Sequence, residues 1–149
     1  MKTVVQVVKK ASVTVNGKIV SEIGEGLLLF VGFSPEDNSE TMKKTIDKTM
    51  GLRIFADGNG KTNLPFDRDR QEVLCVSQFT LYADIRHGKR PSFTSCMRPE
   101  TAEILYENTL DYLKESGYRV QNGIFGADMK VALVNDGPFT LIVDSEDLK

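Results

Sequence analysis

Three polar side chains interrupt an otherwise apolar run from Leu74 to Leu81. They are Ser77, Gln78 and Thr80. The β-branched and aromatic residues of this run are typical of a strand, and we expect one from Val73 to Tyr82. Hydroxyl groups at the end of a strand can serve as nucleophiles for acyl transfer when a general base activates them. The same groups can instead satisfy neighbouring backbone atoms, so both interpretations stay open.

A general base for these hydroxyls is hard to find in the sequence. His87 is the only histidine, and no G-x-S-x-G nucleophile elbow is present. A Ser-His-Asp arrangement through Ser77, or a dyad of Cys75 with His87, would depend on a histidine in a basic loop. Cys75 stands between apolar residues, which favours an inert buried thiol. Backbone N–H groups around Ser77–Thr80 offer a third means of catalysis, since they can stabilise an oxyanion.

Basic residues dominate the segment that follows this strand. Between Asp84 and Glu100 there is no acidic residue, and the fixed positive charges are those of Arg86, Lys89, Arg90 and Arg98. Such charges beside a candidate site suit a phosphate-bearing ligand, because phosphate contacts supply most of the nonspecific affinity for nucleic acids. A solvated basic loop is the alternative interpretation.

A second polar segment, Asn135-Asp136-Gly137-Pro138-Phe139-Thr140, separates two apolar runs. Gly137-Pro138 is most simply a turn. The pair could also form a rigid element that presents carbonyl oxygens, because proline has no N–H to donate. Either isomer of the Gly137–Pro138 bond is compatible with the sequence.

Composition and charge exclude several classes of protein. The chain has 149 residues, which suits one domain with one core, and its net charge of −2 excludes a polycation. No apolar run is long enough to cross a bilayer and no signal-peptide pattern is present, so we expect a cytoplasmic protein without a membrane partner. Cys75 and Cys96 lack a C-x-x-C spacing. Asp84, Asp128 and Asp136 have no spacing that demands a divalent cation, so we expect no metal.

The rest of the sequence predicts the elements that position these segments. Asn16-Gly17 between two apolar runs predicts a hairpin with a type I′ turn. The apolar run at 26–33 predicts a core strand, and helices are expected at about 40–50 and from Pro99 to Gly117. Further strands are expected at 4–8, 12–15, 18–23, 52–55, 120–125, 129–134 and 139–143. This order predicts a single α+β domain over residues 1–149, with mixed or antiparallel, barrel-like β-sheets and two main helices.

Taken together, the two polar segments resemble those of the D-aminoacyl-tRNA deacylases, the chiral-proofreading hydrolases of the D-Tyr-tRNA deacylase family. The resemblance is carried by Ser77–Leu81 and Asn135–Thr140, and it extends through Ala11–Val15, Arg53–Phe55, Arg90–Phe93 and Phe125–Met129. Two separated motifs in register over a chain of this length make the likeness specific.

The resemblance implies a homodimer that hydrolyses the ester between a D-amino acid and the terminal adenosine of tRNA. It also implies action on glycine mischarged on alanine tRNA, with no metal or organic cofactor. Ser77, Gln78, Phe79 and Thr80 would form the catalytic pocket, and Gly137-Pro138 would reach into the partner's pocket as a main-chain wall that rejects L-residues. From the basic segment we expect Arg86, Lys89 and Arg90 to contact tRNA.

Two mechanisms are compatible with this resemblance. In both, main-chain N–H groups near Phe79 and Thr80 stabilise the charge on the carbonyl oxygen. Thr80 is the nucleophile in the first mechanism, whereas in the second a positioned water attacks with help from the adenosine 2′-hydroxyl. We favour the second, because no histidine base accompanies Thr80.

Two residues depart from the family pattern. Members usually carry Gln-Arg-Val where this chain has Gln6-Val7-Val8, and that arginine helps to hold the Gly-Pro loop. Phe139 replaces the valine that usually follows Gly-Pro, and we hypothesise that it fills space left by the absent arginine. Two other functions compete with deacylation: a noncatalytic RNA-binding module that uses the basic segment, and a small-ester hydrolase that uses Ser77 or Cys75.

Overall fold

One long strand, β1 (Lys2–Val15), organises the computed structural model, which describes residues 1–149. The first half of β1 pairs antiparallel with β3 (Gly26–Gly32), and its second half pairs with β2 (Lys18–Ile23). The other edge of β1 pairs along most of its length with β8 (Lys130–Asp144). The sequence predicted two short strands in place of β1, but pairing with β8 continues through Lys10 and joins them.

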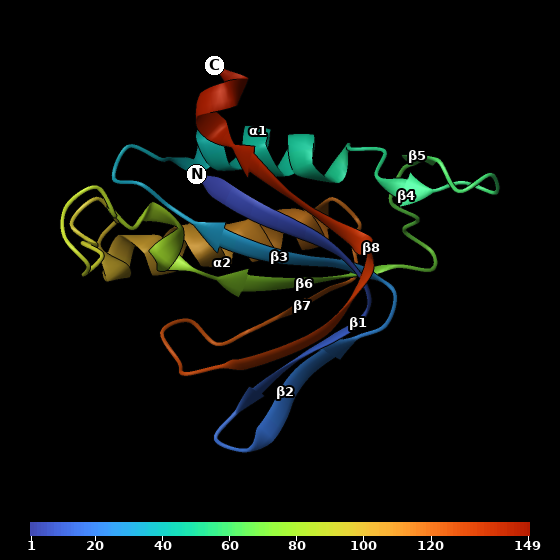
Figure 1. Cartoon of the computed structure of the whole chain (residues 1–149), viewed down its shortest axis with the longest axis horizontal. Helices are drawn as coiled ribbons and strands as arrows, with labels where there is room; N and C mark the ends of the chain where they lie inside the picture. Colours follow the sequence, from blue (N-terminus) through green and yellow to red (C-terminus); the bar gives the residue numbers. More distant parts are fainter.

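Two parallel strands extend the sheet beyond β3. They are β6 (Glu72–Ser77), which pairs with β3, and β7 (Val120–Asn122), which pairs with β6. The order is β2-β1-β3-β6-β7 with β8 attached to β1, and the strongly twisted sheet curls toward a barrel (Figure 1). A small hairpin of β4 (Phe55–Ala56) and β5 (Thr62–Leu64) stands apart at one end.

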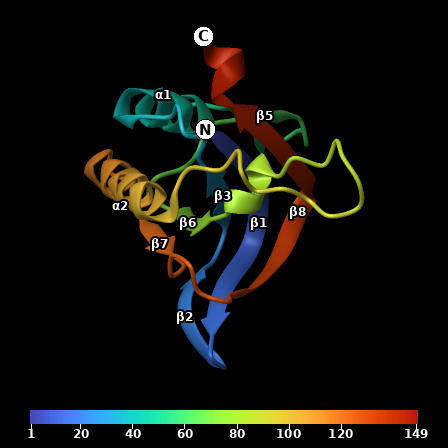
Figure 2. The ribbon, with the colours of Figure 1, turned by 90° about the vertical axis from the view of Figure 1, so that its left-hand side faces the viewer.

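Two helices lie on one side of this sheet, α1 (Ser39–Met50) and α2 (Pro99–Glu115) (Figure 2). The side chain of Asn38 caps α1 by accepting hydrogen bonds from the N–H groups of Glu40 and Thr41. A short 3₁₀ helix, η2 (Ser145–Leu148), ends the chain. The predicted α+β fold, with a mixed, barrel-like sheet and two main helices, is confirmed.

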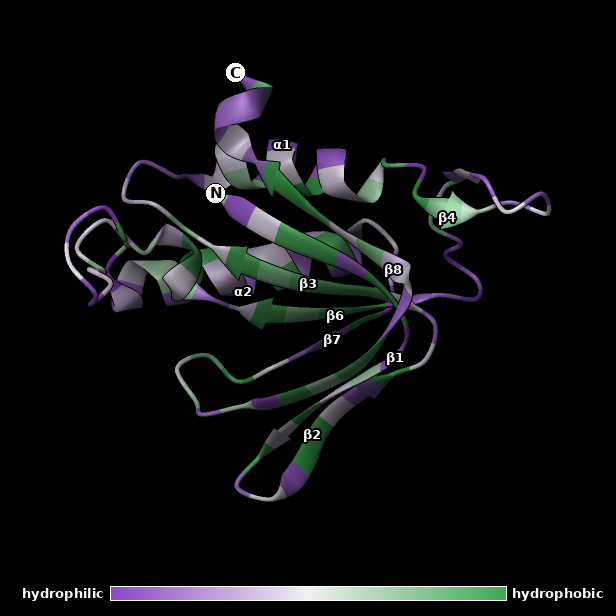
Figure 3. Ribbon diagram, in the orientation of Figure 1, coloured by the Kyte–Doolittle hydropathy of each residue, from purple (hydrophilic) through white to green (hydrophobic).

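The apolar residues of β3 and β6 divide between two clusters, because successive side chains of a strand point to opposite faces. Figure 3 shows that both strands are hydrophobic along their length. The larger cluster, on the helix side, includes Leu27, Leu29, Val31, Met42, Ile46, Cys75, Tyr106 and Leu110. The smaller cluster, inside the curl of the sheet, includes Val8, Ala11, Val13, Ile23, Leu28, Leu74 and Val76. Strands that are buried on both faces explain the continuous apolar runs of the sequence.

The hairpin predicted from Asn16-Gly17 is confirmed. Val15 pairs with Lys18, and φ is 49° at Asn16 and 76° at Gly17, as a type I′ turn requires.

The strand predicted from Val73 to Tyr82 is wrong beyond Ser77. The chain turns there into a 3₁₀ helix, η1 (Phe79–Tyr82). The N–H of Gln78 donates to the carbonyl of Val31 (2.7 Å), but β3 ends one residue later, so η1 has no strand with which to pair. Residues 78–82 have a high propensity for strand, but they do not form one because no neighbouring strand is available for pairing. The strands predicted at 120–125 and 52–55 are likewise shorter or shifted, as β7 and β4.

Of the two interpretations of Gly137-Pro138, the simple turn is wrong, because β8 runs through this pair beside β1. Asn135 pairs with Val8 and Thr140 pairs with Gln6, so five residue steps of β8 span two steps of β1. The surplus residues leave the ladder as a bulge, which we call the Gly-Pro bulge (residues 136–139). The Gly137–Pro138 bond is cis. Turn residues in a sequence do not distinguish a hairpin from a bulge of this size.

The hydroxyl of Tyr106 joins α2 to the strand that leads to the polar segment. It donates to the carbonyl of Cys75 (2.8 Å), which also accepts from the N–H of Gly123 (3.1 Å). We expect Tyr106→Phe to lower the free energy of unfolding by about 1 kcal/mol, because one buried hydrogen bond is lost while the carbonyl keeps a partner. Tyr106→Ala should cost about 3–5 kcal/mol through the cavity it leaves. Urea denaturation measures both, and equal losses would contradict this account.

Candidate active site

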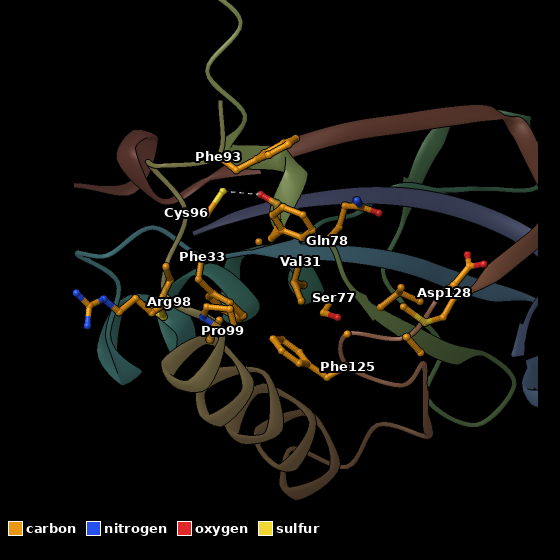
Figure 4. Close-up of a pocket in the computed structure, with 18 of the residues that line it drawn as sticks. Val31, Phe33, Ser77, Gln78, Phe93, Cys96, Arg98, Pro99, Phe125 and Asp128 are labelled. Carbon is orange, nitrogen blue, oxygen red and sulfur yellow. Dashed lines mark hydrogen bonds between the residues drawn. The ribbon is translucent and has the colours of Figure 1, made fainter. Parts of the chain in front are cut away.

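A cavity of about 640 Å³ opens where the carboxyl ends of β3 and β6 meet the start of α2 (Figure 4). Its lining comes from residues 31–33, 76–79, 93–102 and 125–131, and most of the lining side chains are apolar. Cavities of this size, largely apolar with a few polar groups, are typical of sites for small organic ligands.

The polar end of β6 forms one wall of this cavity. Ser77, Gln78 and Phe79 line it directly, and Figure 4 shows Ser77 and Gln78 at its centre. The side-chain amide of Gln78 donates to the hydroxyl of Thr80, which ties the two polar side chains together. The four residues expected to form the catalytic pocket are therefore grouped at one place, although Thr80 does not itself line the cavity.

No histidine is placed to activate these hydroxyls. The cavity lining contains no histidine, and His87 lies in an exposed loop. Cys75 is fully buried in the main core, and this burial raises the pKa of its thiol to about 12. A buried protonated thiol is a poor nucleophile, as the sequence had indicated for Cys75.

The main chain at the start of η1 carries the remaining polar groups of this wall. The first N–H groups of a helix have no acceptor within the helix, and in η1 these belong to Phe79 and Thr80. The carbonyl of Phe79 accepts from the thiol of Cys96 (3.3 Å), a contact drawn in Figure 4. Since the Phe79 carbonyl and the Thr80 N–H belong to one planar peptide group, this contact also orients that N–H.

The Gly-Pro bulge lies outside the cavity of its own chain. Gly137 and Pro138 are both exposed and neither lines the cavity. A glycine is required at 137, because φ is +142° and an added Cβ would lie 2.9 Å from the backbone nitrogen of Phe139. The two polar segments of the sequence are thus not brought together within one copy of the chain.

Polar side chains hold the bulge in place. Asn135 accepts from the N–H of Phe139 (2.7 Å) and donates to the hydroxyl of Thr140 (3.0 Å). Gln6 donates to the same hydroxyl (3.1 Å). Lys9 forms an ion pair with Asp136 (3.3 Å) and another with Glu25 (3.0 Å) at the turn before β3. These contacts support the bulge without an arginine at position 7.

The two departures from the family pattern, Val7 and Phe139, pack against the same apolar cluster. Val7 is buried in the main core, and Phe139 is half-buried against that core. This placement agrees with the hypothesis that Phe139 occupies the space of a larger side chain at position 7.

The basic segment forms a closed loop beside the cavity. The backbones of Asp84 and Ser92 bond to each other in both directions (2.8 and 2.9 Å). The carboxylate of Asp84 accepts from the guanidinium of Arg86 (2.6 and 2.9 Å), and this contact holds the pKa of Asp84 well below its usual range. Arg86 is therefore neutralised by Asp84, whereas Lys89 and Arg90 have no ion-pair partner.

No three side chains of the His, Cys, Asp and Glu types lie together as a metal site would need. None of the helices combines the length and the apolar character that crossing a membrane requires.

Several cavity residues escaped the sequence analysis. Four apolar residues line the site, although nothing in the sequence distinguishes them from core residues: Phe33, Met97, Phe125 and Met129. Arg98 was treated as part of the basic loop, yet it lies at the rim of the cavity. The segment Phe125–Met129, which joins the strands predicted at 120–125 and 129–134, was the available signal.

Comparisons with known proteins place the chain in one family. The family described as D-Tyr-tRNA(Tyr) deacylase matches residues 4–144. The chain is 51% identical to the D-aminoacyl-tRNA deacylase of Dictyoglomus turgidum over 149 residues, which covers 100% of this chain and 96% of that protein. A solved structure titled c-Myc DNA Unwinding Element Binding Protein superposes with a TM-score of 0.89 at 40% identity, covering 97% of this chain and 98% of the other. A probable eukaryotic D-amino acid tRNA deacylase shares the fold at 19% identity, with a TM-score of 0.77 and coverage of 95% and 97%.

The bulge generates a prediction on stability. We expect Gly137→Ala to lower the free energy of unfolding by about 2–3 kcal/mol, because it combines a positive φ with a steric clash. Gly60→Ala should cost only about 1 kcal/mol, because Gly60 has a positive φ of 74° but open space around it. Gly58→Ala, with neither feature, is the control and should be neutral. Thermal and urea denaturation measure the stability of the three variants. If the Gly137 variant is as stable as the Gly60 variant, the steric clash does not contribute.

Proposed function

Because the chain belongs to the D-Tyr-tRNA(Tyr) deacylase family and is accordingly a D-aminoacyl-tRNA deacylase, we propose that its cavity receives the aminoacylated terminal adenosine of tRNA. The enzyme hydrolyses the ester of D-aminoacyl-tRNA, which releases the D-amino acid and the tRNA. Glycine mischarged on alanine tRNA is a substrate of the same pocket, since glycine has no side chain for the pocket to exclude.

The observation that carries this proposal is the separation of the two polar segments within one copy. A bulge that cannot serve its own cavity is available to a second copy, and we propose a homodimer in which Gly137-Pro138 of one chain completes the cavity of the other. The free edge of β8 supports this arrangement, as do its exposed apolar side chains Val134 and Ile142 (46% and 67% exposed). Free strand edges and exposed apolar side chains are features that association covers.

The proposed chemistry rests on the main chain. The N–H groups of Phe79 and Thr80 stabilise the negative charge that develops on the ester carbonyl oxygen. A water molecule, assisted by the 2′-hydroxyl of the adenosine, attacks the carbonyl carbon, and the ester bond to the ribose breaks. Gln78 and Thr80 shape the wall through their mutual hydrogen bond, and Ser77 supplies a polar surface beside them. The absence of a histidine from the cavity lining favours this route over attack by Thr80.

Chirality is selected by exclusion. The Gly-Pro bulge of the second copy forms a rigid wall at the amino acid's Cα, which leaves room for the side chain of a D-residue and none for that of an L-residue. Outside the cavity, Lys89 and Arg90 contact the phosphates of the acceptor end, whereas Arg86 maintains the shape of the loop through Asp84.

Thr80→Ala distinguishes the two chemical routes. With D-Tyr-tRNA as substrate, we expect this variant to keep at least about a tenth of the wild-type kcat, because Thr80 only shapes the wall. Removal of a true nucleophile would instead cost on the order of 10⁶-fold. Single-turnover hydrolysis of labelled D-Tyr-tRNA measures the rate. Complete loss of activity in a folded Thr80→Ala protein would restore the covalent mechanism, and loss in Ser77→Ala alone would favour a serine hydrolase.

Pro138→Ala tests the wall. We expect the ratio of L-Tyr-tRNA to D-Tyr-tRNA hydrolysis to rise at least about tenfold, since steric exclusion of a side chain is worth about 1–3 kcal/mol. Pro65→Ala, in an exposed loop away from the bulge, is the matched control and should not alter the ratio. A Pro138 variant that rejects L-Tyr-tRNA as well as the wild type would contradict the wall, and binding of tRNA without release of either residue by the wild type would favour the RNA-binding alternative.

A further inference from the structure

Two aromatic side chains stand exposed at the mouth of the cavity. Phe79 is 55% exposed and Phe93 is 42% exposed, and their rings meet edge to face with centroids 5.1 Å apart. Both line the cavity, but they come from different segments, η1 and the end of the basic loop. Exposed phenylalanine is costly in water, and a fixed pair at the mouth of a site indicates that a ligand covers it.

The backbone holds this aromatic pair in a defined place. Phe93 directly follows Ser92, whose backbone is paired with Asp84. The carbonyl of Phe93 accepts from the N–H of Cys96 (3.1 Å), and the thiol of Cys96 donates to the carbonyl of Phe79 (3.3 Å). Cys96 therefore links the backbones of Phe79 and Phe93. The two rings are held in place without a bound ligand.

Positive charge surrounds the same side of the cavity. Lys89 and Arg90 precede Phe93 in the loop, and none of these cations, nor Arg98, has an ion-pair partner. The acidic residue of the cavity lining, Asp128, lies on the opposite side from Arg98 and is paired with Lys130 (2.8 Å) (Figure 4). If the end of a polyanion occupies the cavity, electrostatic attraction therefore favours a path for the rest of its chain along Arg98 and Phe93.

We propose that Phe93, together with Phe79, stacks against the base of the nucleotide that immediately precedes the terminal adenosine, while Arg98 contacts the phosphodiester between the two nucleotides. This inference rests on the proposed function, which places the adenosine in the cavity. The end of tRNA that carries the amino acid is single-stranded, so its bases are free to stack on aromatic side chains, and its phosphates need cations nearby. An aromatic pair flanked by unpaired cations matches both requirements.

The experiment compares two substrates that share the ester and the adenosine and differ in the preceding nucleotides. They are D-Tyr-tRNA and D-tyrosyl-adenosine. For Phe93→Ala we expect KM for D-Tyr-tRNA to rise about tenfold more than KM for D-tyrosyl-adenosine, equivalent to about 1.4 kcal/mol, with little change in kcat. Phe93→Tyr should restore KM for the tRNA, and Phe93→Leu should not, because leucine is apolar but offers no ring face. Ile104→Ala, an exposed apolar residue on α2 outside the cavity, is the control.

Arg98→Gln tests the phosphate contact. The slope of log KM for D-Tyr-tRNA against log salt should become shallower by about 0.7, the value for one contact with a single strand. Lys48→Gln on α1 should leave this slope unchanged.

Three results would overturn the stacking proposal. They are an equal rise of KM on both substrates in Phe93→Ala, no rise on either, and a loss of dimer in that variant by sedimentation, which would assign the ring pair to contact between copies. These results are distinct from failure of the proposed function, in which the wild-type protein would hydrolyse neither substrate.

Discussion

Hydrogen bonding along both edges of β1 is the constraint on which the site depends. One edge of β1 holds β3 and, through it, β6, whose end forms the polar wall of the cavity. The other edge holds β8, whose bulge carries Gly137-Pro138. Because β1 and β3 lie between β6 and β8, the two motifs lie apart within a single chain. The proposed second copy is therefore suggested by the pairing of the sheet rather than by the motifs themselves.

The mismatch between β1 and β8 turns a polar segment into a projecting element. β8 has more residues between Asn135 and Thr140 than β1 has between Val8 and Gln6, and the surplus must leave the ladder. Asn135 and Gln6 then satisfy polar groups that the ladder no longer pairs. A projecting main-chain element is the outcome, and it is this element that we propose excludes L-residues by shape.

The proposed catalysis by main-chain groups agrees with the side chains that line the cavity. Its polar wall has hydroxyls and an amide but no histidine, and its cysteine donates to a carbonyl instead of acting as a base. In the proposed mechanism, backbone N–H groups at the turn from β6 into η1 provide the electrostatic stabilisation instead. Lys89 and Arg90 lie outside the cavity lining, in the loop that we propose contacts the phosphates of the tRNA.

The sequence by itself determined the class of the fold and the identity of the candidate motifs. Apolar periodicity, the Asn16-Gly17 turn and the helix ends are local signals, and each depends on neighbouring residues only. The type I′ turn and the Asn38-capped helix accordingly lie where local chemistry places them. Only the tertiary structure decided where β6 stops and that Gly137-Pro138 lies in a bulge. These features depend on which strand lies opposite. A strand from a distant part of the chain cannot be identified from the local sequence.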